Sequence, residues 1–194
     1  MKPLIILDNG HGKDTPGKRS PIWTDGSQLF EYEFNRDVVS RISKMLSKEQ
    51  IRHHELVPEL RDISLPERCG RANRLTVLEK IDPILISIHA NAGGGTGWEC
   101  WTSVGKTKSD EYATILFNEA TKMFPNWKMR ADYSDGDPDK ESQFYILKNT
   151  LCPAILTENF FMDNEYDCKY IMQDAARERI ALMHVQAIKK MIKL

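Results

Sequence analysis

The sequence predicts an α/β fold, in which a twisted, mostly parallel sheet carries helices on both faces within a single domain of residues 1–194. Three short runs rich in leucine and β-branched residues are separated by long amphipathic segments, an alternation typical of parallel sheets covered on both sides. No Pro/Gly/Ser-rich linker and no internal repeat divides the chain. With 41% hydrophobic residues, a chain of 194 residues is long enough to bury one core.

The three apolar runs are the predicted strands, and a proline precedes each of them. They cover Leu4–Leu7, Ile84–Ile88 and Ala154–Leu156. Because they are apolar almost without interruption, they indicate strands that are buried on both faces. The segment "CWTS" (residues 100–103), with its flanks, is predicted to be an edge strand.

Helical spacing of apolar residues predicts helices over about residues 27–48, 65–80 and 109–123, and a helical tail over residues 164–194. Residues 130–142, "RADYSDGDPDKES", have no apolar period and many turn formers, which predicts a long surface loop. Loops of this length inside a domain are often functional. The predicted inner positions are Phe34, Val38, Ile42 and Met45 in the first helix, and Ile180, Met183, Ala187, Ile188 and Met191 in the tail.

Composition excludes several classes of partner. The formal net charge is −1, so bulk electrostatics favour neither nucleic acid nor an anionic membrane. No stretch approaches membrane-spanning length, and the first apolar run is too short for a signal peptide. We therefore expect a monomer that is made and held in the cytoplasm. None of the four cysteines belongs to a C-x-x-C pair, which argues against a zinc ribbon or a thioredoxin-type site. In a chain of this length without a visible secretory signal they are expected to be reduced and buried, with disulfides as the alternative: Cys69, Cys100, Cys152 and Cys168.

Two of the three predicted strands lead into histidine. His11 lies just past the first strand, His89 directly follows the second, and the third runs into Glu158. Ligands of open parallel sheets collect beyond the carboxyl ends of the strands. If the three strands are parallel neighbours, His11, His89 and Glu158 converge at one edge of the sheet.

Two imidazoles and a carboxylate in one cleft predict zinc, which in catalytic sites takes three protein ligands and leaves one position for water. Glu31 is the better carboxylate ligand, because it shares the apolar stripe of Phe34, whereas Glu33 is roughly 200° around the helix and faces solvent. A carboxylate on a buried stripe costs free energy unless it is paired or metal-bound. Gly10 and Gly12 are expected to adopt backbone angles that other residues avoid, and to leave room for a metal and a substrate.

The other histidines have simpler interpretations. His53 and His54 are adjacent on an alternating stretch, where neighbouring side chains point to opposite faces, so we expect an exposed structural pair. His184 lies inside the predicted terminal helix and is expected to be structural. A hydrogen-bonded core histidine is also the alternative for His11 and His89 taken singly.

Five segments of the chain form a recognisable ordered set: "LIILDNGHGKDTPGK", "EYEFN", "LPERCGRANRL", "ILISIHANA" and "PAILTENFFMDN". Together they resemble a known family, the zinc-dependent N-acetylmuramoyl-L-alanine amidases of the amidase_3 type, and in particular short phage and prophage members. The resemblance spans nearly the whole chain and implies zinc ligands at His11, Glu31 and His89 with Glu158 as catalytic glutamate. The family commonly shows "DPGHGG", whereas Asn9 and Lys13 depart from that pattern here without removing a ligand.

The resemblance implies hydrolysis of the peptidoglycan amide that joins N-acetylmuramic acid to L-alanine of the stem peptide. Glu158 would take a proton from water as general base and later deliver one to the leaving amine. Asn91 would donate to substrate or orient a ligand, and Arg130 would meet a stem-peptide carboxylate, with a solvated surface arginine as the alternative. Arg68 and Asn73 are expected to serve helix packing and capping.

Two other functions stay open at this point: a zinc peptidase that cuts within the stem peptide, and a non-catalytic cell-wall binding module. The expected biological setting is a phage or prophage endolysin, stored in the cytoplasm and acting on the wall after release. A bacterial autolysin whose export signal has been trimmed is the alternative.

Overall fold

The apolar runs that predict strands form the centre of a six-stranded sheet. In the computed structural model, which describes residues 2–194, the strand order is β2-β1-β3-β6-β4-β5. The four neighbouring strands β2, β1, β3 and β6 run parallel to one another. β4 pairs with β6 in the antiparallel direction, and β5 runs parallel to β4. The mostly parallel sheet is therefore confirmed. The strands are β1 (Ile5–Asn9), β2 (His53–Glu55), β3 (Ile84–Asn91), β4 (Trp98–Thr102), β5 (Lys140–Glu141) and β6 (Ala154–Phe161).

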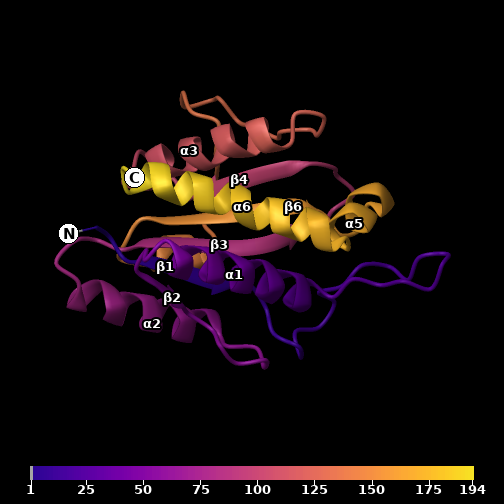
Figure 1. Cartoon of the computed structure of the whole chain (residues 1–194), viewed down its shortest axis with the longest axis horizontal. Coiled ribbons are helices and arrows are strands. Elements are labelled where there is room, and N and C mark those ends of the chain that lie inside the picture. The colour runs from indigo at the N-terminus through magenta and orange to yellow at the C-terminus, as the bar shows by residue number, and fades with distance from the viewer. Residues whose placement is uncertain (1) are drawn as a thin grey trace.

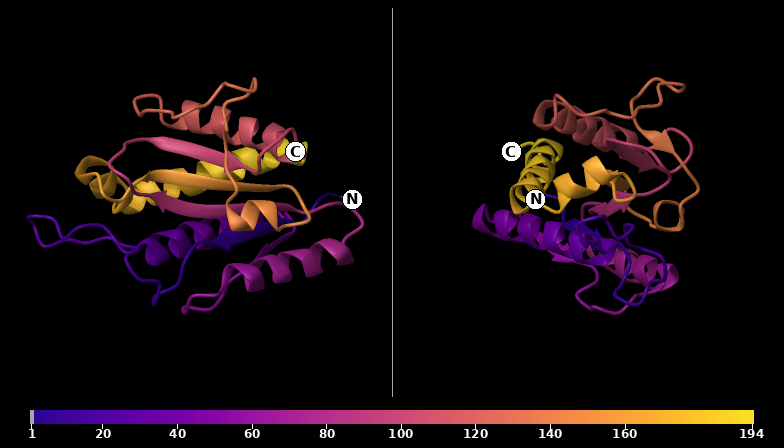
Figure 2. Two further views of the ribbon diagram at one scale, coloured as in Figure 1. Left: turned by 180° about the vertical axis from the view of Figure 1, so that it is seen from behind. Right: turned by 90° about the vertical axis from the view of Figure 1, so that its right-hand side faces the viewer.

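Helices cover both faces of the sheet, but unequally (Figures 1 and 2). Three long helices cover one face, and two shorter ones lie on the other, where α4 is seen in front of the strands in the left view of Figure 2. No helix within residues 2–194 is long and apolar enough to cross a membrane. The helices are α1 (Glu31–Lys48), α3 (Lys108–Met123) and α6 (Asp174–Met191) on the first face, α2 (Leu65–Leu78) and α4 (Tyr145–Lys148) on the second, and α5 (Glu165–Ile171) after β6.

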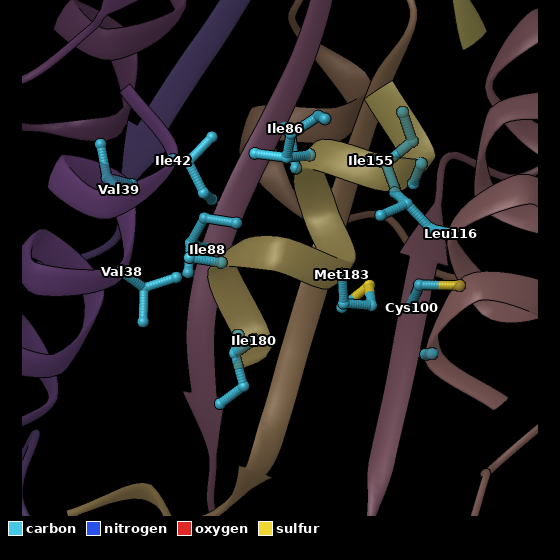
Figure 3. Close-up of a cluster of buried hydrophobic side chains, with 14 of the residues drawn as sticks. Val38, Val39, Ile42, Ile86, Ile88, Cys100, Leu116, Ile155, Ile180 and Met183 are labelled. Atoms are coloured by element: carbon cyan, nitrogen blue, oxygen red, sulfur yellow. The ribbon is translucent and has the colours of Figure 1, made fainter. Parts of the chain in front are cut away.

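The alternation of side chains along each strand divides the core in two. Ile5 and Leu7 of β1 pack in the cluster under α1, α3 and α6, whereas Leu4 and Ile6 pack in the cluster under α2 and α4. Figure 3 shows part of the larger cluster, where α1 and α6 side chains meet the middle of β3. The inner positions predicted for the terminal helix are all buried.

Four element predictions need correction. The first helix begins at Glu31 rather than 27, because residues 19–30 form a ribbon in which Ser20 binds Leu29 and Arg19 pairs with Phe30. The "CWTS" strand is not the edge, since β5 adds two residues outside it. β5 also interrupts the predicted loop of residues 130–142.

The predicted helical tail is divided into α5 and α6. The break lies at Met172–Gln173, where Gln173 takes an extended conformation. Arg177 of α6 donates from Nε to the carbonyl of Ile171, 2.9 Å away, and so satisfies one of the last carbonyls of α5. A side chain from the next helix therefore stabilises the end of α5.

Candidate active site

One face of the sheet carries a row of polar side chains across three strands. His89 of β3 pairs with Glu158 of β6, which in turn lies opposite Glu99 of β4. Directly paired residues project from the same face of a sheet, here the face of α2 and α4. Three strands thus bring an imidazole and two carboxylates side by side.

Glu31 joins this row from the first residue of α1. It is 1% exposed, and its Oε1 lies 3.0 Å from Nδ1 of His89 and 3.4 Å from Nε2 of His11. The candidate ligand atoms of His11, Glu31 and His89 all lie within 4.8 Å of one another. The three residues chosen as zinc ligands from strand ends and helix phase are therefore adjacent, and Glu33 is exposed as expected.

The hydrogen bonds behind His89 indicate which of its nitrogens faces a ligand. The Ser87 hydroxyl donates to Oδ2 of Asp8 at 2.6 Å, and Nε2 of His89 lies 3.1 Å from the same hydroxyl. Since the hydroxyl has one hydrogen, it accepts from His89, so Nε2 carries a proton. Nδ1 of neutral His89 then presents a lone pair to the Glu31 carboxylate.

A lone pair and a carboxylate oxygen 3.0 Å apart require a proton or a cation between them. Oε2 of Glu31 is also buried without a hydrogen-bond partner among the described residues. Two imidazoles and one carboxylate are the ligand set of several catalytic zinc sites. The residues present therefore fit a divalent metal.

His11 is held by its backbone. It has a positive φ of 62°, which is uncommon outside glycine. Its carbonyl accepts hydrogen bonds from Arg36 at 2.8 Å and from Arg68 at 3.3 Å. Arg68 itself is buried and pairs with Asp8 at 2.7 Å, so it connects α2 to the end of β1.

The interpretation of the two glycines is wrong in part. Neither Gly10 nor Gly12 has a positive φ, and the unusual angle falls on His11 between them. A Cβ atom at Gly10 would lie 2.0 Å from Cε1 of His89, and one at Gly12 would lie 2.0 Å from the backbone nitrogen of Asp62. The glycines thus leave room for parts of the protein itself.

The electrostatics of the site separate its two histidines. Burial, together with the charge of His89, lowers the pKa of His11 to about 4 despite Glu31. Burial alone would lower the pKa of His89, but the bond to Glu31 raises it. In Glu31 the same bond and the nearby histidines outweigh burial and lower the pKa. His89 and Glu31 thus behave as an ion pair when no metal is bound.

Glu158 has the opposite electrostatic environment. Burial, followed by the charges of Glu31 and Glu99, raises its pKa to about 8 although His89 opposes the shift. Its Oε2 is buried and has no hydrogen-bond partner within residues 2–194. A carboxyl group whose pKa lies near neutrality is suited to taking and giving protons.

A cavity of about 370 Å³ opens beside these residues. One wall carries the polar site, including His11, His89 and Glu158. Another part of the lining comes from α2, α4 and the segments before them and is largely apolar. Its residues are Ile63, Leu65, Phe144, Tyr145 and Ile146.

The two predicted substrate-binding residues both contact Glu99. Asn91 donates to Oε1 of Glu99 at 2.7 Å, and Nε of Arg130 donates to Oε2 at 2.7 Å. Lys140 of β5 adds a second cation at 2.8 Å from Oε2. Sequence reasoning missed Glu99 and Lys140. The alternation in "WECW" is a signal for a half-buried strand, but it does not identify Glu158 as the partner of Glu99.

The remaining histidines and the cysteines lie outside the site. His53 is half-buried and contacts Ser43, and His54 is exposed. His184 is buried between Thr157 and the carbonyl of Ile180, as expected for a structural residue. All four cysteines are free and buried, which confirms their prediction.

An α/β domain that gathers two histidines and a glutamate beside a second, weakly acidic glutamate is typical of metal-dependent hydrolases. Comparison with known proteins defines the class further. Residues 5–190 match the amidase_3 family model, N-acetylmuramoyl-L-alanine amidase. The chain belongs to this family, as the resemblance predicted. The family reaction is cleavage of the amide between the N-acetylmuramoyl group and L-alanine in peptidoglycan, so the chain is an amidase of the cell wall.

Individual relatives agree with this assignment. The N-acetylmuramoyl-L-alanine amidase CwlM of Bacillus licheniformis is 28% identical over 193 residues, which cover 98% of this chain and 69% of CwlM. The endolysin of Bacillus phage SPP1 is 27% identical over 203 residues, which cover 100% of this chain and 68% of the endolysin. The crystal structure of an N-acetylmuramoyl-L-alanine amidase from Clostridium difficile 630 has the same fold, with a TM-score of 0.82, 24% identity and coverage of 99% and 97% of the two chains.

Proposed function

We propose that the chain is a zinc amidase whose metal ligands are His11, Glu31 and His89. The contact between Nδ1 of His89 and Oε1 of Glu31 carries this proposal, because neutral His89 and ionised Glu31 both offer electron pairs there. When bound, zinc would polarise the substrate carbonyl and lower the pKa of water. The sequence resemblance and the composition of the ligand set support zinc over other divalent metals.

We further propose that Glu158 is the proton carrier of the reaction. As general base it takes a proton from the attacking water, and as general acid it gives one to the alanine nitrogen that leaves. Its position supports both roles, since it lies beside His89 in the cross-strand row and lines the cavity. The raised pKa keeps its proton affinity close to the range in which transfer is reversible.

The behaviour of His89 in this scheme depends on the residues behind it. Ser87 and Asp8 fix the tautomer that directs Nδ1 toward Glu31, which is how carboxylates behind a ligating histidine commonly act. Asn35 donates to the carbonyl of Gly10 at 2.9 Å and so connects α1 to the loop that carries His11. The site is therefore supported by two separate networks.

Product identification tests the proposed chemistry. Purified peptidoglycan is digested with the zinc-loaded protein, and the fragments are analysed by mass spectrometry. An amidase releases glycan free of peptide together with peptides that begin with alanine. Cleavage inside the stem, with alanine still attached to the sugar, would instead establish the peptidase alternative. A strong chelator should stop the reaction, and zinc should restore it.

The mode of delivery to the wall is a second proposal. We propose an endolysin-like enzyme that acts as a monomer after release from the cytoplasm. The match to a phage endolysin supports this setting, although a sporulation-specific amidase of Bacillus subtilis is also similar, at 26% identity. The protein is expressed in a bacterial host with and without a pore-forming holin. Lysis that needs the holin supports release from the cytoplasm, and lysis without it rejects that setting.

A further inference from the structure

The row that contains His89 and Glu158 continues to a cationic cluster. Glu99, the next residue of the row, is 3% exposed and accepts four hydrogen bonds. Two of its donors are cations and two are neutral, so the cluster holds two positive charges around one negative charge. The donors are Asn91 and Trp101 to Oε1, at 2.7 and 3.2 Å, and Arg130 and Lys140 to Oε2, at 2.7 and 2.8 Å.

Both cations of the cluster are held in place by aromatic rings as well. The guanidinium of Arg130 lies 5.1 Å from the ring centre of Phe161, and Nζ of Lys140 lies 4.9 Å from that of Trp101. Arg130 commits its Nε to Glu99, and among residues 2–194 its two terminal nitrogens have no side-chain or backbone acceptor. A fixed arginine with two free N–H groups is well suited to a carboxylate.

The chemistry of the proposed reaction gives the cleft a direction. Glu158 has to reach the leaving nitrogen, which is the first atom of the stem peptide, while the acyl half of the amide lies toward His11 and His89. The neighbour of Glu158 on the side away from His89 is Glu99. The peptide therefore leaves the cavity over β4.

Distances indicate which residue of the stem peptide can reach Arg130 and Lys140. Adjacent strands lie about 4.8 Å apart, and two extended peptide residues span at most about 7 Å. The second residue of the stem is an acidic amino acid in peptidoglycan. It therefore lies within reach of Arg130 and Lys140, the two cations bound to Glu99. Asp132 is a further acid near Lys140, and its exposed side chain accepts a hydrogen bond from the backbone N–H of Ser134.

We propose that Arg130 and Lys140, positioned by Glu99, form the subsite for the carboxylate of the second stem residue. This assignment rests on the proposed amidase reaction and adds a substrate preference to it. Glu99 is a positioning residue here, because it holds the two cations and does not itself contact the substrate.

The test uses two synthetic muramoyl tripeptides that differ in one group. In both, the second residue is a γ-linked D-glutamate, and its α-carboxyl group is either free or converted to the carboxamide. The wild type should cleave the free acid with a kcat/KM roughly tenfold to a hundredfold higher, the range of a charge-assisted hydrogen-bond pair. The difference should lie in KM, since the carboxylate does not take part in the bond that breaks.

Substitutions test whether the preference for the free acid depends on Arg130 and Lys140. Arg130→Gln and Lys140→Gln should each reduce the preference for the free acid over the carboxamide, mostly by raising KM for the free acid. Arg130→Lys should restore part of it. Lys128→Gln, an exposed lysine two residues from Arg130, is the matched control and should keep the full preference.

Two outcomes would overturn the assignment and can be told apart. Equal kcat/KM for both tripeptides, or a preference that survives in Arg130→Gln and Lys140→Gln, rejects the subsite and leaves the amidase reaction intact. If zinc-loaded wild type is folded, as checked by circular dichroism, and cleaves neither tripeptide, the proposed function is rejected and the subsite with it.

Discussion

Gly10 lies directly against the imidazole of His89, so closely that a Cβ atom at Gly10 would be 2.0 Å from Cε1 of the ring. The glycine of the first strand end thus determines where the histidine of the neighbouring strand can lie. The added carbon would lie within 2.5 Å of three atoms of the rigid ring, Cε1, Nε2 and Nδ1, so no flexible end of a side chain can give way.

Gly10→Ala should therefore displace His89 and weaken metal binding. Overpacking of this kind typically costs about 1–3 kcal/mol, and here it falls on a proposed ligand. We expect at least a tenfold loss of zinc affinity, measured by competition with a chromophoric chelator. Gly70→Ala is the control, since its Cβ atom would meet only Arg74 at 3.6 Å inside a helix. Wild-type zinc affinity in Gly10→Ala would show that His89 does not depend on this contact.

The role of Gly10 illustrates what the sequence can and cannot predict. The buried strands and the long helices follow from hydrophobic periodicity, which is local, and the phase of α1 correctly placed Glu31 inward and Glu33 outward. Contacts between distant segments leave no such local pattern. The glycines flanking His11 were expected to make room for a ligand, whereas Gly10 accommodates a ring that comes from 79 residues further along the chain.

The same reasoning explains why Glu99 and the antiparallel direction of β4 were missed. Glu99 gains its importance from pairing with Glu158 and from cations at positions 130 and 140. The break before α6 likewise depends on Arg177 reaching back to Ile171. The grouping of His11 and His89 was easier to predict, because the carboxyl ends of neighbouring parallel strands meet at one edge of the sheet.

Ser87→Ala should weaken metal binding without unfolding the protein. It removes the acceptor that fixes His89 Nε2–H and leaves the buried Asp8 with one partner fewer. Loss of such a supporting contact typically costs about 10–100-fold in metal affinity. Chelator competition measures the effect. Ser43→Ala, which removes a serine contact to His53 far from the site, is the control. Equal zinc affinity in both variants would mean that Ser87 does not orient His89.

Glu158→Gln should separate chemistry from metal binding. The amide keeps the shape of the side chain but cannot take or deliver a proton, so turnover of a muramoyl peptide should fall by about 10²–10⁴-fold. Zinc content, measured by elemental analysis, should stay at the wild-type level because Glu158 is not a proposed ligand. Near-normal turnover in the variant would remove Glu158 from the mechanism.

The pH dependence of stability should report on His184, which is fully buried and accepts from Thr157 while it donates to Ile180. Burial lowers its pKa from 6.5 to about 4. Between pH 4 and pH 6.5, His184 is protonated in the unfolded chain but neutral in the folded chain. The contribution of neutral His184 is therefore complete above pH 6.5 and is lost as the pH falls toward 4.

The lost free energy of unfolding should reach about 3 kcal/mol near pH 4. Urea unfolding of the metal-free protein, prepared with a chelator, measures this loss between pH 7 and pH 4.5. His184→Gln should lose clearly less free energy of unfolding than the wild type over this interval. His54→Gln, at an exposed histidine, should behave like the wild type. Identical losses in the wild type and His184→Gln would mean that the interior accepts the proton, and that Thr157 or a solvent path stabilises the imidazolium.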